Sequence, residues 1–144
     1  MAGIDALGTQ FLRESAVPGT FEAIANVTDI SGPSRSRESI DVTAHDSPNK
    51  YREYIKGLKD GGDVELTINY DPNSTTHTSL DADFEEDSLH TYQVLLLPGT
   101  ATEHTWEFSG MITDLGDAFP TDDKMERTVT VKISGKPTLT KTGV

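Results

Sequence analysis

The chain has 144 residues, and its 24 Asp and Glu outnumber its 12 Lys and Arg, so the formal net charge is −12 at pH 7. This length predicts one domain with a packed core. The strong negative charge opposes binding to nucleic acids and anionic lipids. Because the chain has no cysteine, disulfides and thiolate metal sites are excluded.

The acidic residues are concentrated in the middle of the chain. From Asp60 to Asp123 there is no Lys or Arg, but there are fifteen Asp and Glu. Lys and Arg contacts to phosphate supply most of the sequence-independent affinity for nucleic acids. This stretch is therefore excluded as a conventional nucleic-acid binding surface, although it could form a wall that nucleic acid passes without adhering.

The first part of the chain shows weak signals of regular structure. Residues 1–10 have no basic n-region and no long apolar h-region, so no secretion signal is predicted. Residues 1–17 are expected to form an N-terminal arm. Residues 20–30 and 39–43 are weak strand candidates, and they flank a loop rich in Ser, Gly, Pro and Arg at 31–37.

Residues 47–58 have the pattern of a short helix. Ser47 is placed to cap it, and Pro48 suits its first position. An apolar stripe follows at i, i+3, i+4 and i+7. The stripe consists of Tyr51, Tyr54, Ile55 and Leu58.

Most of the remainder of the chain alternates apolar and polar residues in the manner of half-buried strands, whereas the apolar run at 94–97 is typical of a strand covered on both faces. Strands are predicted at 64–70, 92–97, from 104 onward and at 129–133, while 73–88 is either a helix or an ordered loop. The longest apolar run, 94–97, is far shorter than the about 20 residues of a membrane span, so no membrane embedding is expected. The predicted fold is mainly β: a β-sandwich or small barrel with one or two short helices.

No catalytic, metal or cofactor site is predicted. The four histidines, His45, His77, His90 and His104, match no zinc-binding spacing. The acidic run 81–87 fails as a calcium loop, because Glu86 stands where Gly is required and Tyr92 stands where Glu is required. Trp106 alternates with Phe108 and Ile112, which predicts packing in the core.

An ordered series of short motifs resembles the major tail tube proteins of long, flexible-tailed bacteriophages. The series is IDVTAHDSP at 40–48, YREYI-x-GL at 51–58, DGGDV at 60–64, NYDP at 69–72, WEFSGMI at 106–112 and VTVKISG at 129–135. It covers roughly residues 19–138. The resemblance implies an N-terminal arm at 1–17, a tail-tube β-sandwich domain at 18–138 with a short flanking helix, and a C-terminal tail at 139–144.

The same resemblance implies a structural, non-enzymatic role. Copies would close into homo-hexameric rings, and stacked rings would form the tail tube of a virion assembled from protein made in the bacterial cytoplasm. DNA would pass through transiently without adhering, and the implied partners are a tape-measure protein and tail-end proteins. Candidate lumen-lining residues alternate with the core on the predicted strands, and a solvated outer face remains the alternative for each. They are Glu65, Thr67, Asn69, Glu107, Ser109 and Thr113.

Ring stacking requires a second surface, for which residues 1–17, 31–38 and 71–88 are the predicted suppliers. Arg35 and Arg37 form one of the few basic places in the chain, and we hypothesise that they meet an acidic segment of the next ring. Its candidate residues are Asp81, Asp83, Glu85, Glu86 and Asp87. A loop with two solvated arginines is the alternative.

Three other functions stay open at this point. One is a monomeric carbohydrate- or protein-binding β-sandwich with Trp106 and the loop tyrosines as ligand contacts. Another is a tube protein of a bacterial contractile secretion system, and the third is a small acidic hydrolase. Rings or tubes at high protein concentration would separate the tube proteins from the other two.

Overall fold

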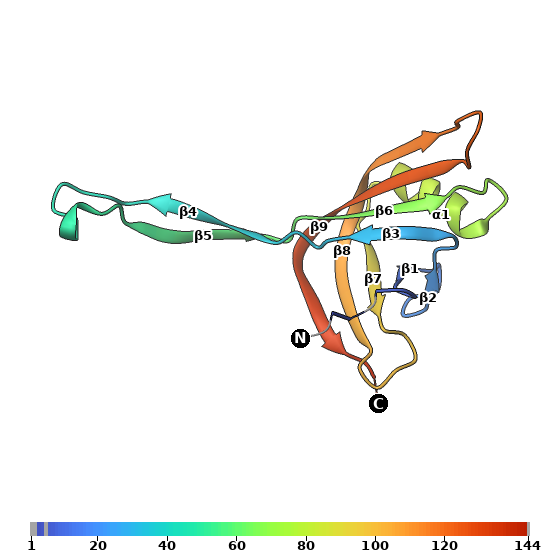
Figure 1. The fold of residues 1–144 in the computed structure, drawn as a ribbon, viewed down its shortest axis with the longest axis horizontal. Coiled ribbons are helices and arrows are strands. Elements are labelled where there is room, and N and C mark those ends of the chain that lie inside the picture. The colour runs from blue at the N-terminus through green and yellow to red at the C-terminus, as the bar shows by residue number, and fades with distance from the viewer. Residues whose placement is uncertain (1–2, 5, 144) are drawn as a thin grey trace.

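A computed structural model describes residues 3–4 and 6–143. Residues 1, 2 and 5 of the predicted N-terminal arm and residue 144 of the predicted tail lie outside the described residues. The described chain forms a body, built on one antiparallel sheet, and a two-stranded hairpin that projects from it (Figure 1). The predicted mainly β fold class is confirmed.

The sheet of the body has seven strands in the order β2-β1-β7-β8-β9-β6-β3. Its strands are β1 (Gln10–Glu14), β2 (Phe21–Ala23), β3 (Val27–Ser31), β6 (Asp63–Asn69), β7 (His90–Leu96), β8 (His104–Ala118) and β9 (Glu126–Lys141). The strands predicted at 64–70, 92–97 and from 104 match β6, β7 and β8, whereas β9 is much longer than the predicted 129–133.

The long hairpin of β8 and β9 joins the two halves of the sheet. One half of β9, from Glu126 to Lys132, pairs with β6, and the first half of β8 pairs with β7. The β8–β9 register shifts between Glu107 and Ser109, and again between Ile112 and Asp114. Such irregularities increase strand twist and bend, so the sheet curls until β1 contacts β3.

The core lies on the concave side of the curled sheet. Alternate residues of β6 and β9 point inward, and their side chains are at most 4% exposed. Aromatic rings from three neighbouring strands pack beside them, with Phe11 and Tyr92 at a centroid distance of 5.6 Å. Burial of this apolar surface is the main stabilising contribution to the body.

Part of the predicted N-terminal arm belongs to the sheet. Residues Gln10–Glu14 form β1, which pairs with both β2 and β7. Phe11 is fully buried in the core. An interior strand position satisfies the backbone groups of this segment and buries an aromatic ring, so residues 10–14 cannot act as a free arm.

The predicted helix at 47–58 is wrong. Residues 36–60 instead form an extended hairpin, here called the arm, made of β4 (Ser36–Asp41), a short 3₁₀ turn η1 (Pro48–Lys50) and β5 (Tyr54–Asp60). Figure 1 shows the arm extending well away from the body. Its strands pair only with each other, as a separate two-stranded sheet.

Local chemistry explains why the hairpin replaces the helix. Asn49 and Lys50 have positive φ angles of 55° and 63°, which end any helical turn. The hydroxyl of Ser47 does not cap a helix but bonds Glu53 Oε2 and the amide of Ala44, each at 2.9 Å. Tyr and Ile favour strands. In addition, the apolar stripe that a helix would present has no surface of the body to pack against.

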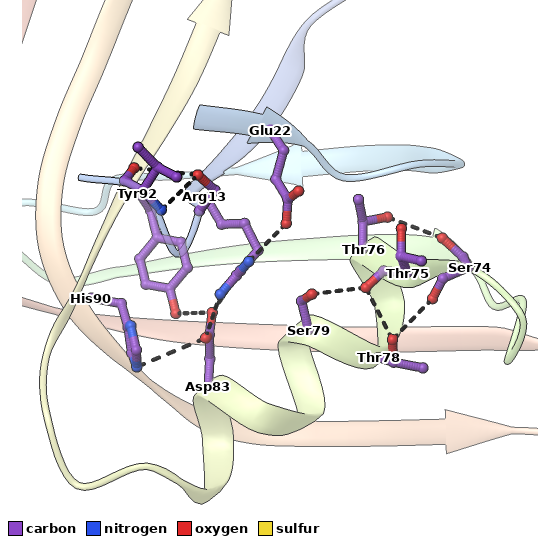
Figure 2. Close-up of polar contacts among 12 residues, drawn as sticks. Arg13, Glu22, Ser74, Thr75, Thr76, Thr78, Ser79, Asp83, His90 and Tyr92 are labelled. Carbon is purple, nitrogen blue, oxygen red and sulfur yellow. Dashed lines mark hydrogen bonds and ion pairs between the residues drawn. The ribbon is translucent and has the colours of Figure 1, made fainter. Parts of the chain in front are cut away.

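The segment predicted at 73–88 as helix or loop contains the helix α1 (Thr75–Glu85). Leu80 and His77 of this helix are fully buried, and α1 packs against β8. Figure 2 shows hydroxyl contacts in its first turn, where Ser79 donates to the carbonyl of Thr75 at 2.8 Å. No helix among the described residues is long and apolar enough to cross a membrane.

Candidate functional surfaces

The convex face of β6, β7, β8 and β9 is polar. Because directly paired residues of antiparallel strands share a face, the strand register places a large set of side chains opposite the core. The set is Asp63, Glu65, Thr67, Asn69, Thr91, Gln93, Leu95, Glu107, Ser109, Met111, Asp114, Thr128, Thr130 and Lys132. We call this set the convex polar face.

Five of the six lumen candidates lie on this face. Glu65, Glu107 and Ser109 are exposed, and Thr67 is half-buried. Asn69 ends β6, also half-buried, and its Oδ1 has no hydrogen-bond partner among the described residues. The structure therefore brings together, on β6 and β8 with β9 between them, residues that are up to 44 positions apart in the sequence, from Glu65 to Ser109.

The sixth candidate, Thr113, stands at an irregularity of β8. Ile112 pairs with Val131 and Asp114 pairs with Thr130, so Thr113 is an extra residue without a direct partner. Its hydroxyl approaches the carbonyl of Thr130 at 3.4 Å. The bulge reverses the alternation, and Asp114 occupies the outward position. Strict alternation in the sequence does not reveal Asp114, because nothing in the local pattern marks the bulge.

Lys132 is the only Lys or Arg among the described residues of the convex polar face. Its ammonium lies 3.2 Å from Asp60 and 3.7 Å from Asp63. The hydrogen bond to Asp60 raises the pKa of Lys132, while the Gly62 amide, followed by Lys132, lowers the pKa of Asp60. Two carboxylates therefore neutralise this cation, and the net charge of the face is negative.

The arm carries a different surface. Between Arg35 and Lys59 the sequence has six of its twelve basic residues but only four of its 24 acids. Large apolar side chains are also exposed there. They are Ile40 (42%), Val42 (44%), Tyr51 (75%), Tyr54 (54%), Ile55 (52%) and Leu58 (84%). A cluster of exposed apolar side chains of this size is typical of an interaction site.

The two arginines of the stacking hypothesis lie at the base of the arm. Arg35 places its guanidinium 4.9 Å from the centre of the Trp106 ring, a cation–π contact that fixes the base of the arm to β8. Trp106 packs against the core. Arg37 is exposed on β4 and pairs across the hairpin with Lys59.

The five acidic stacking candidates divide into two groups. Asp83 is 4% exposed, and it accepts hydrogen bonds from Arg13 at 2.7 and 3.0 Å and from the Tyr92 hydroxyl at 3.0 Å (Figure 2). Burial removes Asp83 from any surface, which corrects its prediction as a stacking residue. Asp81 forms an ion pair with Arg127 at 3.2 Å.

The remaining candidates, Glu85, Glu86 and Asp87, are exposed at the end of α1. Glu86 Oε2 lies 3.2 Å from His90 Nε2. The neighbouring Phe84 and Leu89 are 43% and 52% exposed. We call residues 84–89 the acidic segment.

The histidines have ordinary structural surroundings. The buried His77 accepts a hydrogen bond from the Asp71 amide at Nδ1 and contacts the Ala25 carbonyl through Nε2 at 2.6 Å. This geometry assigns the proton to Nε2. Among the described residues, no group of three or more His, Asp or Glu is arranged to hold a metal ion.

Comparison with known proteins identifies related chains. Residues 5–140 match the family described as "Lambda phage tail tube protein, TTP". A search of curated protein sequences finds no match. Among solved structures, a chain from the tail of an empty gene transfer agent particle, refined with C6 symmetry, superposes with a TM-score of 0.77 at 18% identity, covering 96% of this chain and 99% of that one.

Two further structures have the same fold. The SPP1 tail tube gives a TM-score of 0.71 at 8% identity, covering 94% of this chain and 78% of that chain. A chain of the sheath–tube complex of an extracellular contractile injection system (PVC) gives 0.73 at 15% identity, covering 96% and 92%.

Proposed function

Because the chain belongs to the lambda phage tail tube protein family, we propose that six copies close into a ring and that stacked rings form a tube. The chain is thus a structural component of a phage tail and not an enzyme. The C6 symmetry of the similar gene transfer agent tail supports the ring of six. Family membership favours a phage tail over a monomeric ligand-binding sandwich, a hydrolase or a contractile secretion tube.

The convex polar face is proposed to line the bore of the tube. The observation that carries this assignment is the charge of the face, where the single cation is held by Asp60 and Asp63. Each phosphate neutralised by a Lys or Arg of the wall would add affinity for passing DNA. A lining of carboxylates and Thr hydroxyls lets DNA pass without adhering.

The reach of this repulsion is short. Screening limits electrostatic interaction to about 8 Å at physiological ionic strength. The lining therefore acts as a thin repulsive layer and does not block entry of DNA into the bore. A tape-measure protein inside the tube and proteins at the two tail ends complete the proposed set of partners.

The ring proposal is tested by concentrating the purified protein and imaging it by negative-stain electron microscopy. Rings or hollow tubes are expected. A protein that stays monomeric at every concentration, in light scattering as well as in micrographs, would contradict the proposal.

The lining is tested on tubes of the double variant Glu65→Lys/Glu107→Lys, mixed with labelled duplex DNA and sedimented. The added cations should make the tubes retain DNA, and retention should fall steeply as salt rises. The matched control, Glu65→Gln/Glu107→Gln, removes the same carboxylates without adding cations and should retain little DNA. If the Lys variant forms tubes that retain no more DNA than the Gln variant, this face does not line the bore.

A further inference from the structure

An open groove of about 980 Å³ lies where the arm meets the body. Four cations contribute to its lining, namely Arg35, Arg37, Lys59 and Lys136. Two carboxylates, Glu38 and Asp60, also line it, and Asp60 already binds Lys132 and accepts a hydrogen bond from the Gly62 amide. Within the described part of the chain, no carboxylate lies within 4.0 Å of the charged atoms of Arg37, Lys59 or Lys136.

The pairing inside the arm makes this concentration of positive charge unfavourable in a free subunit. Arg37 and Lys59 are directly opposite each other across β4 and β5, and like charges at such positions repel. Leu58, beside them in the groove, is 84% exposed. The cations outnumber the carboxylates of the groove, and Arg37, Lys59 and Lys136 lack an ion-pair partner among the described residues. Together with an uncovered apolar side chain, they indicate a missing occupant that is both anionic and apolar.

The acidic segment has this chemistry. It contains Glu85, Glu86 and Asp87 between the exposed Phe84 and Leu89, and no cation. It cannot fill the groove of its own chain in this fold, because no residue of 84–89 lines the groove and α1 packs against β8 instead. The acidic segment could therefore fill such a groove only in another copy.

We propose that the groove at the base of the arm binds the acidic segment of a second copy of this chain. The proposal rests on the assembly proposed above and names the residues that make one of its contacts. Because the two surfaces differ, each copy offers one of each, and such a heterologous contact propagates from copy to copy. Charge complementarity also sets the orientation of the copies, because like surfaces repel.

The test uses charge reversal on each side of the contact. Neither Arg37→Glu/Lys59→Glu nor Glu85→Lys/Asp87→Lys should assemble alone, and each should lower the sedimentable fraction by at least about tenfold, since both oppose the charge of their partner. All four substituted residues are exposed, so the thermal unfolding of the unassembled variants should match that of the wild type.

Mixing the two variants supplies the decisive result. The reversed groove of one variant complements the reversed segment of the other, and the unchanged groove and segment complement each other. Equal amounts should therefore co-assemble, with the two variants alternating, and the variant carrying all four substitutions should assemble alone. Residual single rings in either double variant place the contact between rings, whereas residual monomers place it within a ring.

A rival occupant is tested by Asp122→Lys/Asp123→Lys, which reverses the acids of the β8–β9 turn. Loss of assembly there, with normal assembly of Glu85→Lys/Asp87→Lys, would overturn the proposal. So would failure of the two variants to rescue each other. A wild-type protein that never assembles would instead refute the tube function, so the two failures are distinguishable.

Discussion

At the level of single residues, Asp83 holds together the polar part of the interior. Its carboxylate accepts two hydrogen bonds from Arg13 and one from Tyr92, and its side chain is only 2% exposed. Arg13 in turn reaches Glu22 near the surface at 2.7 Å. These residues join α1, β1, β2 and β7 (Figure 2), so the network fixes the helix to one half of the sheet.

Replacing Asp83 should therefore be costly. Asp83→Ala leaves the nearly buried Arg13 guanidinium without its main partner, and we expect a loss of about 3–5 kcal/mol in the free energy of unfolding. Glu22→Ala is the matched control, because the Glu22 side chain is 39% exposed and an exposed ion pair contributes less than about 1 kcal/mol. Urea unfolding of the unassembled protein measures both. Equal losses in the two variants would contradict this account.

Tyr92 gives the network a dependence on alkaline pH. Burial, reinforced by the neighbouring Asp83, raises the pKa of Tyr92 above its ordinary value of 10.0. The folded state then keeps a proton that the unfolded state loses. This contribution to stability is complete below pH 10.0 and is lost as pH rises toward the folded pKa.

Tyr92→Phe separates the pH dependence that comes from Tyr92 from that of the other titratable groups. The variant loses a hydrogen bond to a buried carboxylate and should be about 1–2 kcal/mol less stable than wild type at neutral pH. Above pH 10.0 the wild type also loses the stabilisation that comes from its raised Tyr92 pKa, whereas the variant has no group there that ionises. The difference in the free energy of unfolding between the two proteins should therefore shrink. Denaturant unfolding measured at a series of pH values from neutral to alkaline checks this, and a constant difference would refute it.

At the level of elements, the arm and the body behave as separate units. β4 and β5 pair only with each other, and Ser39 lies opposite Lys56 in their register. A two-stranded hairpin alone is marginally stable in water, so the arm contributes little to the stability of the body. Its exposed apolar residues have a role only when another surface covers them.

Shortening the arm tests this separation. Replacing residues 40–55 by an Asn–Gly turn joins Ser39 to Lys56 with a connection suited to a two-residue hairpin. The shortened protein should unfold at nearly the wild-type temperature, as judged by circular dichroism, but should not form tubes. A body that no longer folds would show that the arm is part of the folding unit.

Some elements could be predicted from the sequence because their patterns are local. Alternation identifies β6, β8 and the first part of β9, each with one buried and one polar face, and an apolar run identifies β7. β1 was missed because its assignment depends on pairing with β7, about eighty residues later. The helix predicted at 47–58 failed because an apolar stripe indicates a helix only if a core covers it, and here Tyr51 and Leu58 are 75% and 84% exposed.

The candidate surface residues also divide into those that local patterns predict and those that depend on contacts between distant parts of the chain. The outward positions of β6 and β8 are local consequences of alternation, and the structure groups most of them on one face. The burial of Asp83 could not be predicted, because it depends on Arg13, seventy positions away. The contact between Arg35 and Trp106 depends equally on the tertiary fold.

For the whole molecule, the separation of charge is the main property relevant to assembly. The arm is rich in cations, whereas the convex polar face and the acidic segment are negative. A chain of net charge −12 repels its copies in general. Specific contacts between unlike surfaces can overcome this repulsion and also exclude wrong orientations.

The rates of backbone amide hydrogen exchange should report directly on assembly. In the free subunit, backbone amides of β4 and β5 should exchange rapidly, because they belong to an isolated hairpin, while amides of β6 and β9 should be strongly protected. In tubes, the arm amides should become protected and those of β6 and β9 should change little. Mass spectrometry of both states measures this, and an arm protected equally in both states would count against its role in assembly.

The long β8–β9 hairpin has a mechanical consequence for such a tube. Its two strands are hydrogen-bonded along most of their length, from His104 paired with Lys141 to Ala118 paired with Glu126, so each body resists stretching and bending as one piece. Curvature of the filament must then be accommodated at the contacts between copies. A tail built in this way would bend by changes at the contacts between subunits, while each subunit keeps its shape.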